Sequence, residues 1–493
     1  MGSEASKSIE NSFFNEFEVS SVYLSQDNFQ YQVDGEDILG ISSMELDTLD
    51  PDLSTQFLNI LGYPEESEET FHPSQNLSSE AEDSWSCSPS TKSSEYSSLQ
   101  LASLNVPRED MEMDTRVILP HLLEAHVEAR DQNQIALVEE ILRCINQKTS
   151  PLAEDPLERL AFHYSSQNIT GNLEAHFLQQ EASKNFDPAF RVFYQSTPYG
   201  RFAHFVANSA IVEAIPEDSE AIHIIDFDMG EGVQWPPVIE AISQQNKALK
   251  LTSIKWETEQ QNSEEPKRNL SEYARSCGLK TTIEEKSFEE LVTELKKLNK
   301  RGGSARRDFL IFNCMVGLPH MGRGRSRRSV TEYLNLGKNM IRKNTCNRGI
   351  ITFGDGEADE KLRNSLNFRS FFDGNTMHYK ALMESIESNF PACFSQARTA
   401  IEFLFVEPYV SSVAWMKKWE ELRGNCHFQA GNGFGINGRR LSEEILMEAR
   451  EMLGGSREAS CEARIEGQNG NEMVLSWKGK QLVKVSTWGS QKV

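Results

Sequence analysis

The chain lacks any apolar run that approaches the roughly 18 residues of a membrane-spanning helix, so no membrane span is expected. Its eight cysteines are scattered without a Cys-x-x-Cys pair, which argues against a zinc ribbon or a disulfide framework and indicates a reducing compartment. The ten histidines form no His-Glu-x-x-His motif, and neither a nucleophile elbow nor a phosphate-binding P-loop is present. These absences leave no persuasive metal site and no convincing catalytic set.

The 493 residues carry a net charge of −24, and most of that charge lies near the N-terminus. Residues 1–110 contain 22 acidic and 3 basic side chains, whereas the rest of the chain is nearly neutral, at −5. Phosphate contacts need a basic face, so a chain of this charge is not an obvious nucleic-acid-binding protein. Any surface that contacts DNA must therefore be a local basic cluster.

Residues 1–110 are rich in Ser, Glu and Asp and are predicted to be a disordered acidic segment. Apolar and aromatic residues recur among the acids, a composition typical of activation or partner-binding segments; a solubilising tail is the alternative. Asp50 as an N-cap and Pro51 in the first turn predict a short helix that forms on binding. Gly2 and Ser6 fit the loose myristoylation pattern, but so short a pattern often occurs by chance.

Helical periodicity begins near Thr115 and predicts an α-helical cap over residues 115–215. Apolar residues recur three and four positions apart, as in IALVEEILRCI from Ile135 to Ile145, and Asp155-Pro156 is a typical helix start. Two interpretations of these apolar faces remain open: they form a buried core, or they form a dimerisation surface.

Strand-like runs then alternate with helix-like stretches, an order that predicts right-handed βαβ crossovers and a mostly parallel sheet. Two further runs around Lys478-Gly479 predict a C-terminal antiparallel hairpin. The predicted fold is α/β and Rossmann-like, of the class I methyltransferase type, preceded by the helical cap and the acidic tail. The predicted parallel strands are residues 221–226, 249–256, 279–285, 308–314 and 349–353, and the hairpin strands are residues 472–477 and 481–488.

The segment IHIIDFDMGEGVQWPP has the order of strand, acidic glycine-containing turn and helix that opens a nucleotide-binding doubly wound fold. Glycines permit a sharp turn and the close approach of a ligand or another backbone. His223, inside the predicted strand, is expected to be a hydrogen-bonded core residue rather than a catalytic one. The strand residues are Ile222, His223, Ile224, Ile225 and Asp226, and the turn residues are Asp228, Gly230 and Gly232.

In an open α/β sheet, a ligand binds beyond the carboxyl ends of the strands. The polar residues at those ends are Asp226, Asp228, Glu257, Asn313 and Asp355. Asp-x-Gly-x-Gly after the first strand and an acid after the second resemble an S-adenosylmethionine-dependent methyltransferase. Gln234 takes the position of a third glycine, and Trp235 and Trp256 lie near the crevice, so the glycines are expected only to permit the turn. A methyltransferase or another small-ligand-binding Rossmann protein is the alternative.

Two basic clusters flank the fourth predicted strand, one before it (Lys296 to Arg307) and one after it. The second cluster, in HMGRGRSRRS, consists of Arg323, Arg325, Arg327 and Arg328. Such a loop is a candidate for contacting DNA phosphates or for nuclear import, and an ordinary solvated loop is the alternative.

Several motifs in the same order resemble the GRAS family of plant transcriptional regulators. The block from RVFYQSTPYGRFAHF through IHIID is similar to the family's VHIID region, with Ile222 in place of the usual Val. Trp477 and Trp488 match the tryptophan pair of the SAW region, while FNCMVGLPHM and EGVQW are most similar to the nodulation-signalling-pathway-2 branch. The regions implied within a GRAS domain of residues 111–493 are 115–215 (first leucine-rich), 194–259 (VHIID), 269–301 (second leucine-rich), 308–402 (PFYRE) and 403–490 (SAW).

The resemblance implies a regulator of transcription in the plant nucleus, with the cytoplasm as a second compartment, in symbiosis or hormone signalling. It implies homo- or heterodimers with other GRAS proteins and DNA-binding transcription factors as partners. Promoter DNA would be contacted directly or through such a partner. It also implies a methyltransferase-like core without enzyme activity and without a cofactor.

Overall fold

The structure is a computed structural model that describes residues 115–166, 173–245, 247–256, 264–300, 308–342, 348–357, 362, 364–390, 394–424, 436–454 and 460–489. The predictions that fall outside these residues concern the segment 1–110, with Gly2 and the helix at Asp50, and the side chains of Glu257, Arg301, Arg306 and Arg307. Within the described ranges, no helix is long and apolar enough to cross a bilayer.

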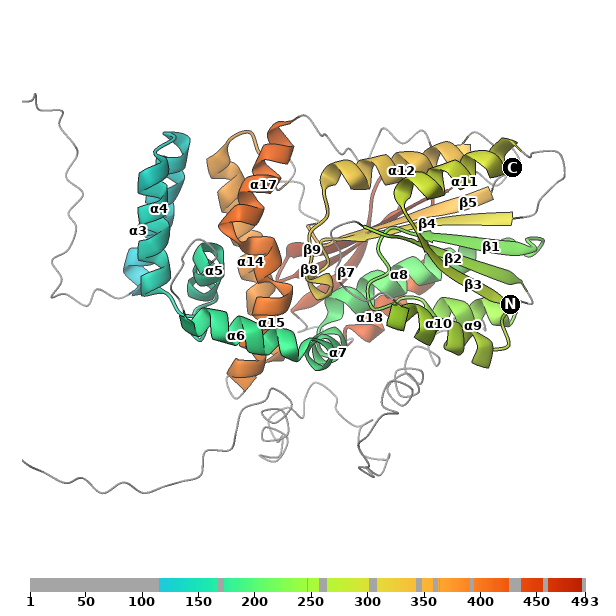
Figure 1. Cartoon of the computed structure of the whole chain (residues 1–493), viewed down its shortest axis with the longest axis horizontal. Helices are drawn as coiled ribbons and strands as arrows, with labels where there is room; N and C mark the ends of the chain where they lie inside the picture. Colours follow the sequence, from blue (N-terminus) through green and yellow to red (C-terminus); the bar gives the residue numbers. More distant parts are fainter. Residues whose placement is uncertain are drawn as a thin grey trace, which may run out of the picture.

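A nine-stranded sheet forms the centre of the α/β part of the molecule (Figure 1). Its strand order is β3-β2-β1-β4-β5-β9-β8-β7, with β6 paired to β9, and β1 to β5 are parallel. The predicted Rossmann-like, mostly parallel sheet is confirmed. The strands are β1 (Ala221–Asp226), β2 (Ala248–Ile254), β3 (Thr281–Lys286), β4 (Asp308–Val316), β5 (Arg348–Asp355), β6 (Asn437–Gly438), β7 (Cys461–Glu466), β8 (Glu472–Trp477) and β9 (Lys480–Gly489).

From β1 the chain adds β2 and β3 on one side of the sheet, and then β4 and β5 on the other side. The order of the strands across the sheet therefore changes direction between β1 and β4. At the carboxyl end of β1, Asp226 is in register with Ser253 of β2 and with Asn313 of β4. A doubly wound sheet binds its ligands beyond the strand ends at such a reversal, so these residues mark the place of the candidate site.

The predicted C-terminal hairpin was incomplete, because β8 and β9 continue into a third antiparallel strand, β7. The sequence of β7, CEARIE, carries Glu462, Arg464 and Glu466, and only Ala463 is fully buried. A half-solvated edge strand gives little hydrophobic signal, which is why the sequence did not predict it.

Helices cover both faces of the sheet (Figure 1). The helices on one face are α11 (Phe288–Lys300) and α12 (Arg327–Arg342), and those on the other are α8 (Pro198–Ala214), α9 (Pro236–Ser243), α10 (Glu264–Ser276) and α18 (Glu443–Met452). The turn of helix η3 (Pro319–Met321) lies in the loop between β4 and α12. Although α8 falls within residues 115–215, it packs against β5 and β9 and so belongs to the α/β core.

The helical cap lies at one end of the sheet and combines two separate parts of the chain (Figure 1). Helix α5 packs against α14, and α6 packs against α15, although some 200 residues separate the members of each pair. The cap helices are α3 (Thr115–Asp131), α4 (Ile135–Lys148), α5 (Pro156–Ser165), α6 (Leu173–Lys184), α7 (Phe186–Ser196), α14 (Phe368–Asn389), α15 (Ser395–Phe405), α16 (Glu407–Val410) and α17 (Ser412–Arg423).

The apolar face predicted for α4 is largely core. Val138, Ile141, Leu142 and Ile145 are all buried. By contrast, Ile135 is 47% exposed, and Val117 of α3 and Leu137 of α4 are exposed as well. Most of the predicted apolar face is therefore buried core, and a few single apolar side chains of the same two helices face solvent.

The cap also contains a group of ionisable side chains, most of them buried, which we call the cap ion cluster: Arg159, His163, Glu387, Arg398 and Glu402. The Nε atom of Arg159 lies 3.0 Å from a carboxylate oxygen of Glu402, and both side chains are fully buried. Arg159 also donates to the backbone carbonyls of Ala153 and Glu154. The cluster therefore joins α5 to α14 and α15 through charge-assisted hydrogen bonds.

Candidate functional site

The loop after β1 turns sharply at Gly230 and Gly232, whose φ angles are 55° and 76°. Side chains other than that of glycine rarely adopt this left-handed region. At Gly232, an added Cβ atom would also lie 2.9 Å from Leu270 of α10. The backbone conformation and the packing of the turn therefore explain the presence of both glycines without a ligand.

Behind this loop, polar side chains at the strand ends form a buried hydrogen-bonded group that we call the crevice network. Its members are Asn208, Asp226, Gln234, Trp235, Asn313 and Thr352. Asp226 accepts hydrogen bonds from Trp235 Nε1 at 2.9 Å and from Asn313 Nδ2 at 3.0 Å. Every member is less than 9% exposed, so these groups satisfy one another away from water.

Gln234 fills the position where a third glycine would leave space for a ligand. Its amide group bonds to Asn208 at 3.2 Å and to Asn313 at 3.0 and 3.2 Å. Trp235, which begins α9, is completely buried beneath the turn. The central part of the crevice is thus occupied by the protein's own side chains.

Burial raises the pKa of Asp226 to about 7, although hydrogen bonds from Asn313 and Trp235 oppose that shift. Such a carboxyl group changes its charge near neutral pH. Among the described residues, its two oxygens accept hydrogen bonds from Trp235, Asn313 and the backbone N–H of Asp228, so they are already used within the protein.

His223 lies within β1 and donates to or accepts from the hydroxyl of Thr252 at 2.9 Å. Burial, followed by the charge of Lys250, lowers the pKa of His223 to about 4. His223 is thus a buried histidine with a hydrogen bond to the neighbouring strand, in agreement with the prediction of a hydrogen-bonded core histidine. The neighbouring Ile222, Ile224 and Ile225 are also buried in the core.

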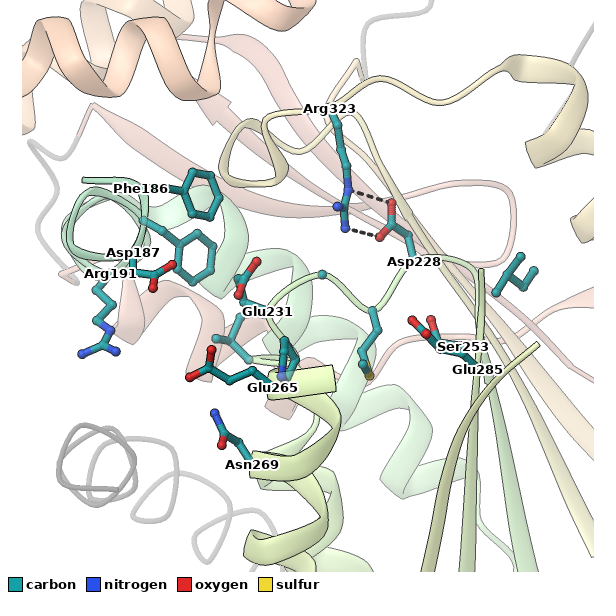
Figure 2. A pocket seen from close by; sticks show the side chains of 16 residues that line it. Phe186, Asp187, Arg191, Asp228, Glu231, Ser253, Glu265, Asn269, Glu285 and Arg323 are labelled. Atoms are coloured by element: carbon teal, nitrogen blue, oxygen red, sulfur yellow. Dashed lines mark hydrogen bonds and ion pairs between the residues drawn. The ribbon is translucent and has the colours of Figure 1, made fainter. Parts of the chain in front are cut away.

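Two arginines from the loop after β4 hold Asp228 on both sides. Arg323 contacts Asp228 through Nη2 at 2.5 Å and through Nε at 3.2 Å, and Arg325 contacts it through Nη2 at 2.7 Å (Figure 2 shows Arg323). The Asp228 side chain is 2% exposed, and the guanidinium of Arg325 also lies 5.4 Å from the ring of Trp256. We call Asp228, Arg323 and Arg325 the arginine clamp, since it fixes the loop over the end of β1.

The four arginines predicted as a DNA or import loop therefore differ in exposure. Arg323 and Arg325 point inward to Asp228, whereas the side chain of Arg328 is 80% exposed and pairs with Glu332 one helical turn away. The backbone N–H of Arg327 donates to Glu421 of α17. Among these four arginines, Arg328 has the most exposed side chain and is the best placed to offer positive charge to a phosphate, while Arg327 is partly buried near Glu357.

Trp477 and Trp488 lie on β8 and β9 and are 5% and 2% exposed. They belong to different hydrophobic clusters, and Trp488 is in register with Ile351 of β5. Both tryptophans are thus core residues that attach the antiparallel strands to the rest of the protein.

An open cavity of about 270 Å³ lies beside the arginine clamp, between α7, the glycine turn and α10 (Figure 2). The cavity was not predictable from the sequence, because its walls come from six separate segments of the chain. Its lining residues are Phe186, Asp187, Phe190, Arg191, Asp228, Met229, Gly230, Glu231, Val233, Ser253, Ile254, Glu265, Pro266, Asn269, Glu285 and Arg323. Among the described residues, no group of three or more His, Cys, Asp or Glu side chains is arranged to hold a metal ion.

The fold and the filled crevice define an α/β protein of the class I methyltransferase type whose glycine turn is packed by its own side chains. The family model of the GRAS domain family matches residues 119–489. The chain belongs to the GRAS domain family.

Curated relatives agree with this assignment. The chain is 29% identical over 311 residues to Protein NODULATION SIGNALING PATHWAY 2 of Medicago truncatula, a match that covers 61% of this chain and 58% of that protein. It is 25% identical over 414 residues to Scarecrow-like protein 26 of Arabidopsis thaliana, which covers 79% and 80% of the two chains. The crystal structure of SCL7 in Oryza sativa shares the fold, with a TM-score of 0.53 and 21% identity over 75% of this chain and 99% of that one.

Proposed function

We propose that this chain is a regulator of transcription in the plant nucleus that acts through protein partners and catalyses no reaction. The observation that carries this proposal is the crevice network, in which Gln234 and Trp235 occupy the centre of the place where a methyltransferase would bind its cofactor. Membership of the GRAS domain family supports the regulatory role. Similarity to two nodulation-signalling proteins, from Medicago truncatula and Lotus japonicus, supports a role in symbiotic signalling.

Other GRAS proteins, as homo- or heterodimer partners, and DNA-binding transcription factors are the proposed partners. The exposed apolar side chains Val117, Ile135 and Leu137 on α3 and α4 support a contact through the cap. Exposed aliphatic side chains are removed from water when a partner covers them. The acidic segment 1–110 is the proposed activation or partner-binding region.

Recovery of partners from plant nuclei tests this proposal. A tagged full-length chain is cross-linked in plant cells, and proteins from isolated nuclei are identified by mass spectrometry. We expect a GRAS protein and at least one DNA-binding factor, with less GRAS protein for the variant Val117→Glu/Ile135→Glu. Met447→Glu, at an exposed position on α18 that is 61% exposed, is the matched control. Absence of the chain from nuclei would contradict the proposal.

Promoter DNA is contacted directly or through a partner, and the loop end at Arg327 and Arg328 is the proposed direct contact. The Arg327→Ala/Arg328→Ala variant leaves the arginine clamp intact and should flatten the salt dependence of DNA binding by about one to two units of slope. Arg440→Ala, at a side chain that is 75% exposed, is the control. An unchanged slope would assign DNA targeting to a partner protein.

A methyltransferase is the second candidate function, because the sheet order and the glycine turn are shared with that class. Calorimetry with S-adenosylmethionine separates the two candidates. A dissociation constant in the low micromolar range, about −8 kcal/mol, would favour the enzyme. We expect no binding in that range, since a cofactor would have to displace the hydrogen-bonded Gln234.

A further inference from the structure

The cavity beside the arginine clamp has an excess of carboxylates on its walls. Three of these carboxylates make no ion pair within the described part of the chain: Asp187, Glu231 and Glu265. Arg191 also lines the cavity but forms no ion pair with any of the three. The other two acids are already neutralised, Asp228 by the arginine clamp and Glu285 by Lys267 at 3.1 Å. Figure 2 shows the carboxylates of Asp187, Glu231 and Glu265 gathered between α7 and the start of α10, while Arg191 points away.

The effect of this charge is visible in Glu231. Burial, and then the negative charge of Asp187, raises the pKa of Glu231 above its ordinary value, with Glu265 and Asp228 adding to the shift. Arg323 acts in the opposite direction but does not cancel it. A positive charge brought into the cavity would therefore be attracted by several carboxylates at once.

The wall formed by α7 carries two aromatic rings beside Asp187. Phe186 and Phe190 are stacked on α7, with their ring centroids 6.2 Å apart and their planes at 15°. The faces of aromatic rings attract ammonium and guanidinium groups, and their apolar surface also packs against an organic body. The cavity thus combines carboxylates and aromatic rings, which suits an organic cation better than a hydrated metal ion.

The cavity continues inward to a smaller space of about 30 Å³ that shares Phe186, Phe190 and Glu231 with it. His320 lines this inner space, is 5% exposed, and its Nδ1 atom has no hydrogen-bond partner among the described residues. Burial, followed by the charge of Arg323, lowers the pKa of His320 to about 3. The ring is therefore neutral at pH 7, and its Nδ1 atom packs against Gly200 of α8.

We propose that this cavity binds a small organic cation, with its ammonium or guanidinium group among Asp187, Glu231 and Glu265 and its body against Phe186 and Phe190. The volume of about 270 Å³ is near the lower end for ligand sites and fits a molecule of about a dozen non-hydrogen atoms. The site lies at the glycine turn and the ends of β2 and β3, and its inner extension reaches Gln234. It gives the GRAS domain a place to sense a metabolite without catalysis.

Calorimetry on the full-length chain with three compounds of the same shape tests the proposal. Tyramine carries an ammonium group, tyrosol has a neutral hydroxyl in its place, and 4-hydroxyphenylacetate has a carboxylate. We expect tyramine to bind at least about tenfold more tightly than the other two, a difference of about 1.4 kcal/mol. Because this comparison uses the unaltered chain, it does not depend on the folding of any variant. Equal affinities, or no tyramine binding up to about 10 mM, would overturn the proposal.

Variants then locate the binding site. Glu231→Gln should weaken tyramine binding about fivefold, because it removes one partly buried charge. Glu272→Gln makes the same change on an exposed face of α10 that does not line the cavity, and should leave the affinity unchanged. Tyramine should also bind more weakly as the pH falls, since the raised pKa of Glu231 makes this carboxylate take up a proton at a higher pH than an ordinary one. An affinity unaffected by Glu231→Gln and by pH would place the compound elsewhere and refute the assignment.

Discussion

The crevice network and the cap ion cluster are both buried polar groups, but they are built from different chemistry. The crevice network consists of neutral amides, a hydroxyl, an indole and one carboxyl group with a pKa of about 7, Asp226. In the cap, Arg159 faces Glu402 with both side chains fully buried, and Arg398 and Glu387 extend the group of charges. One region keeps its polar groups uncharged or nearly so, and the other pairs full charges.

This difference predicts how each region responds to the loss of a member. Removing one partner of a buried ion pair leaves the other charge without compensation in a medium of low polarity, which costs several kcal/mol. A neutral network loses a hydrogen bond and leaves an unsatisfied dipole, at a smaller cost. A substitution in the cap ion cluster should therefore lower the free energy of unfolding more than one in the crevice network.

The largest expected effect is that of Arg159→Met. The change keeps most of the side-chain volume but leaves Glu402 buried without its nearest cation, so the free energy of unfolding should fall by about 3–5 kcal/mol. Urea denaturation followed by circular dichroism measures this. Arg440→Met, at a side chain that is 75% exposed, should change stability by less than about 0.5 kcal/mol. A loss below about 1 kcal/mol for Arg159→Met would mean that the buried ion pairs of the cap are no more sensitive to substitution than the neutral network.

The next effect concerns the pH dependence of stability at Asp226. Its pKa in the folded protein is about 7, above the ordinary value of 3.8, so the folded state holds a proton that the unfolded state releases between pH 4 and 7. The stability that this bound proton contributes is fully present below pH 4 and is lost as the pH rises through 7. Between pH 5 and pH 8 the wild-type chain should lose about 2–3 kcal/mol that Asp226→Asn does not lose. Parallel stability curves for the two proteins over this range would show that Asp226 ionises normally.

A smaller effect is expected from Trp235→Phe, which removes the hydrogen bond to Asp226 at 2.9 Å. We expect a loss of about 1–2 kcal/mol, because a buried acceptor is left unsatisfied. Trp415→Phe is a matched control, since Trp415 is equally buried but its Nε1 atom has no hydrogen-bond partner among the described residues. Thermal melts give the loss of stability for each variant. Both lose the same side-chain volume, so the difference between the two losses is the contribution of the hydrogen bond. If both variants lose the same stability, the hydrogen bond contributes nothing.

The smallest effect should come from Glu387→Gln, at the solvent-facing edge of the cap ion cluster. The Glu387 side chain is 35% exposed and lies 3.3 Å from Arg159, so water screens the pair and the loss should stay below about 1 kcal/mol. Glu402→Gln, at a fully buried side chain in the same cluster, should cost several times more. Equal losses in urea denaturation would mean that burial does not set the strength of these pairs.

The parallel sheet was predictable from the sequence because most of its strands are short apolar runs bounded by turn residues; the exception is β3, with the sequence TTIEEK. Asn313 was visible in the same way, as a polar residue at the end of the apolar run DFLIF. Since the carboxyl ends of parallel strands meet at one edge, its proximity to Asp226 followed from the fold alone. The neutral role of His223 followed from its position between buried isoleucines.

The partners of Asp228 and of Arg159 were not predictable, because nothing local connects them. Asp228 is 95 and 97 residues away from the two arginines that hold it, and Arg159 is 243 residues away from Glu402. In the sequence, Arg323 and Arg325 were indistinguishable from the exposed Arg328. Their orientation depends on the path of a loop fixed by Tyr409, whose hydroxyl contacts the backbone of Leu318 and Arg323.

The position of β9 has a consequence for the nascent chain. This strand emerges last among the described elements, yet it lies inside the sheet, between β5 and β8. Until the ribosome has released it, β5 presents an unpaired edge that is open to association with other chains. A premature stop codon before Lys480 would therefore remove an interior strand together with Trp488, rather than trim a peripheral end. Even a short C-terminal truncation should behave in the cell as a null allele.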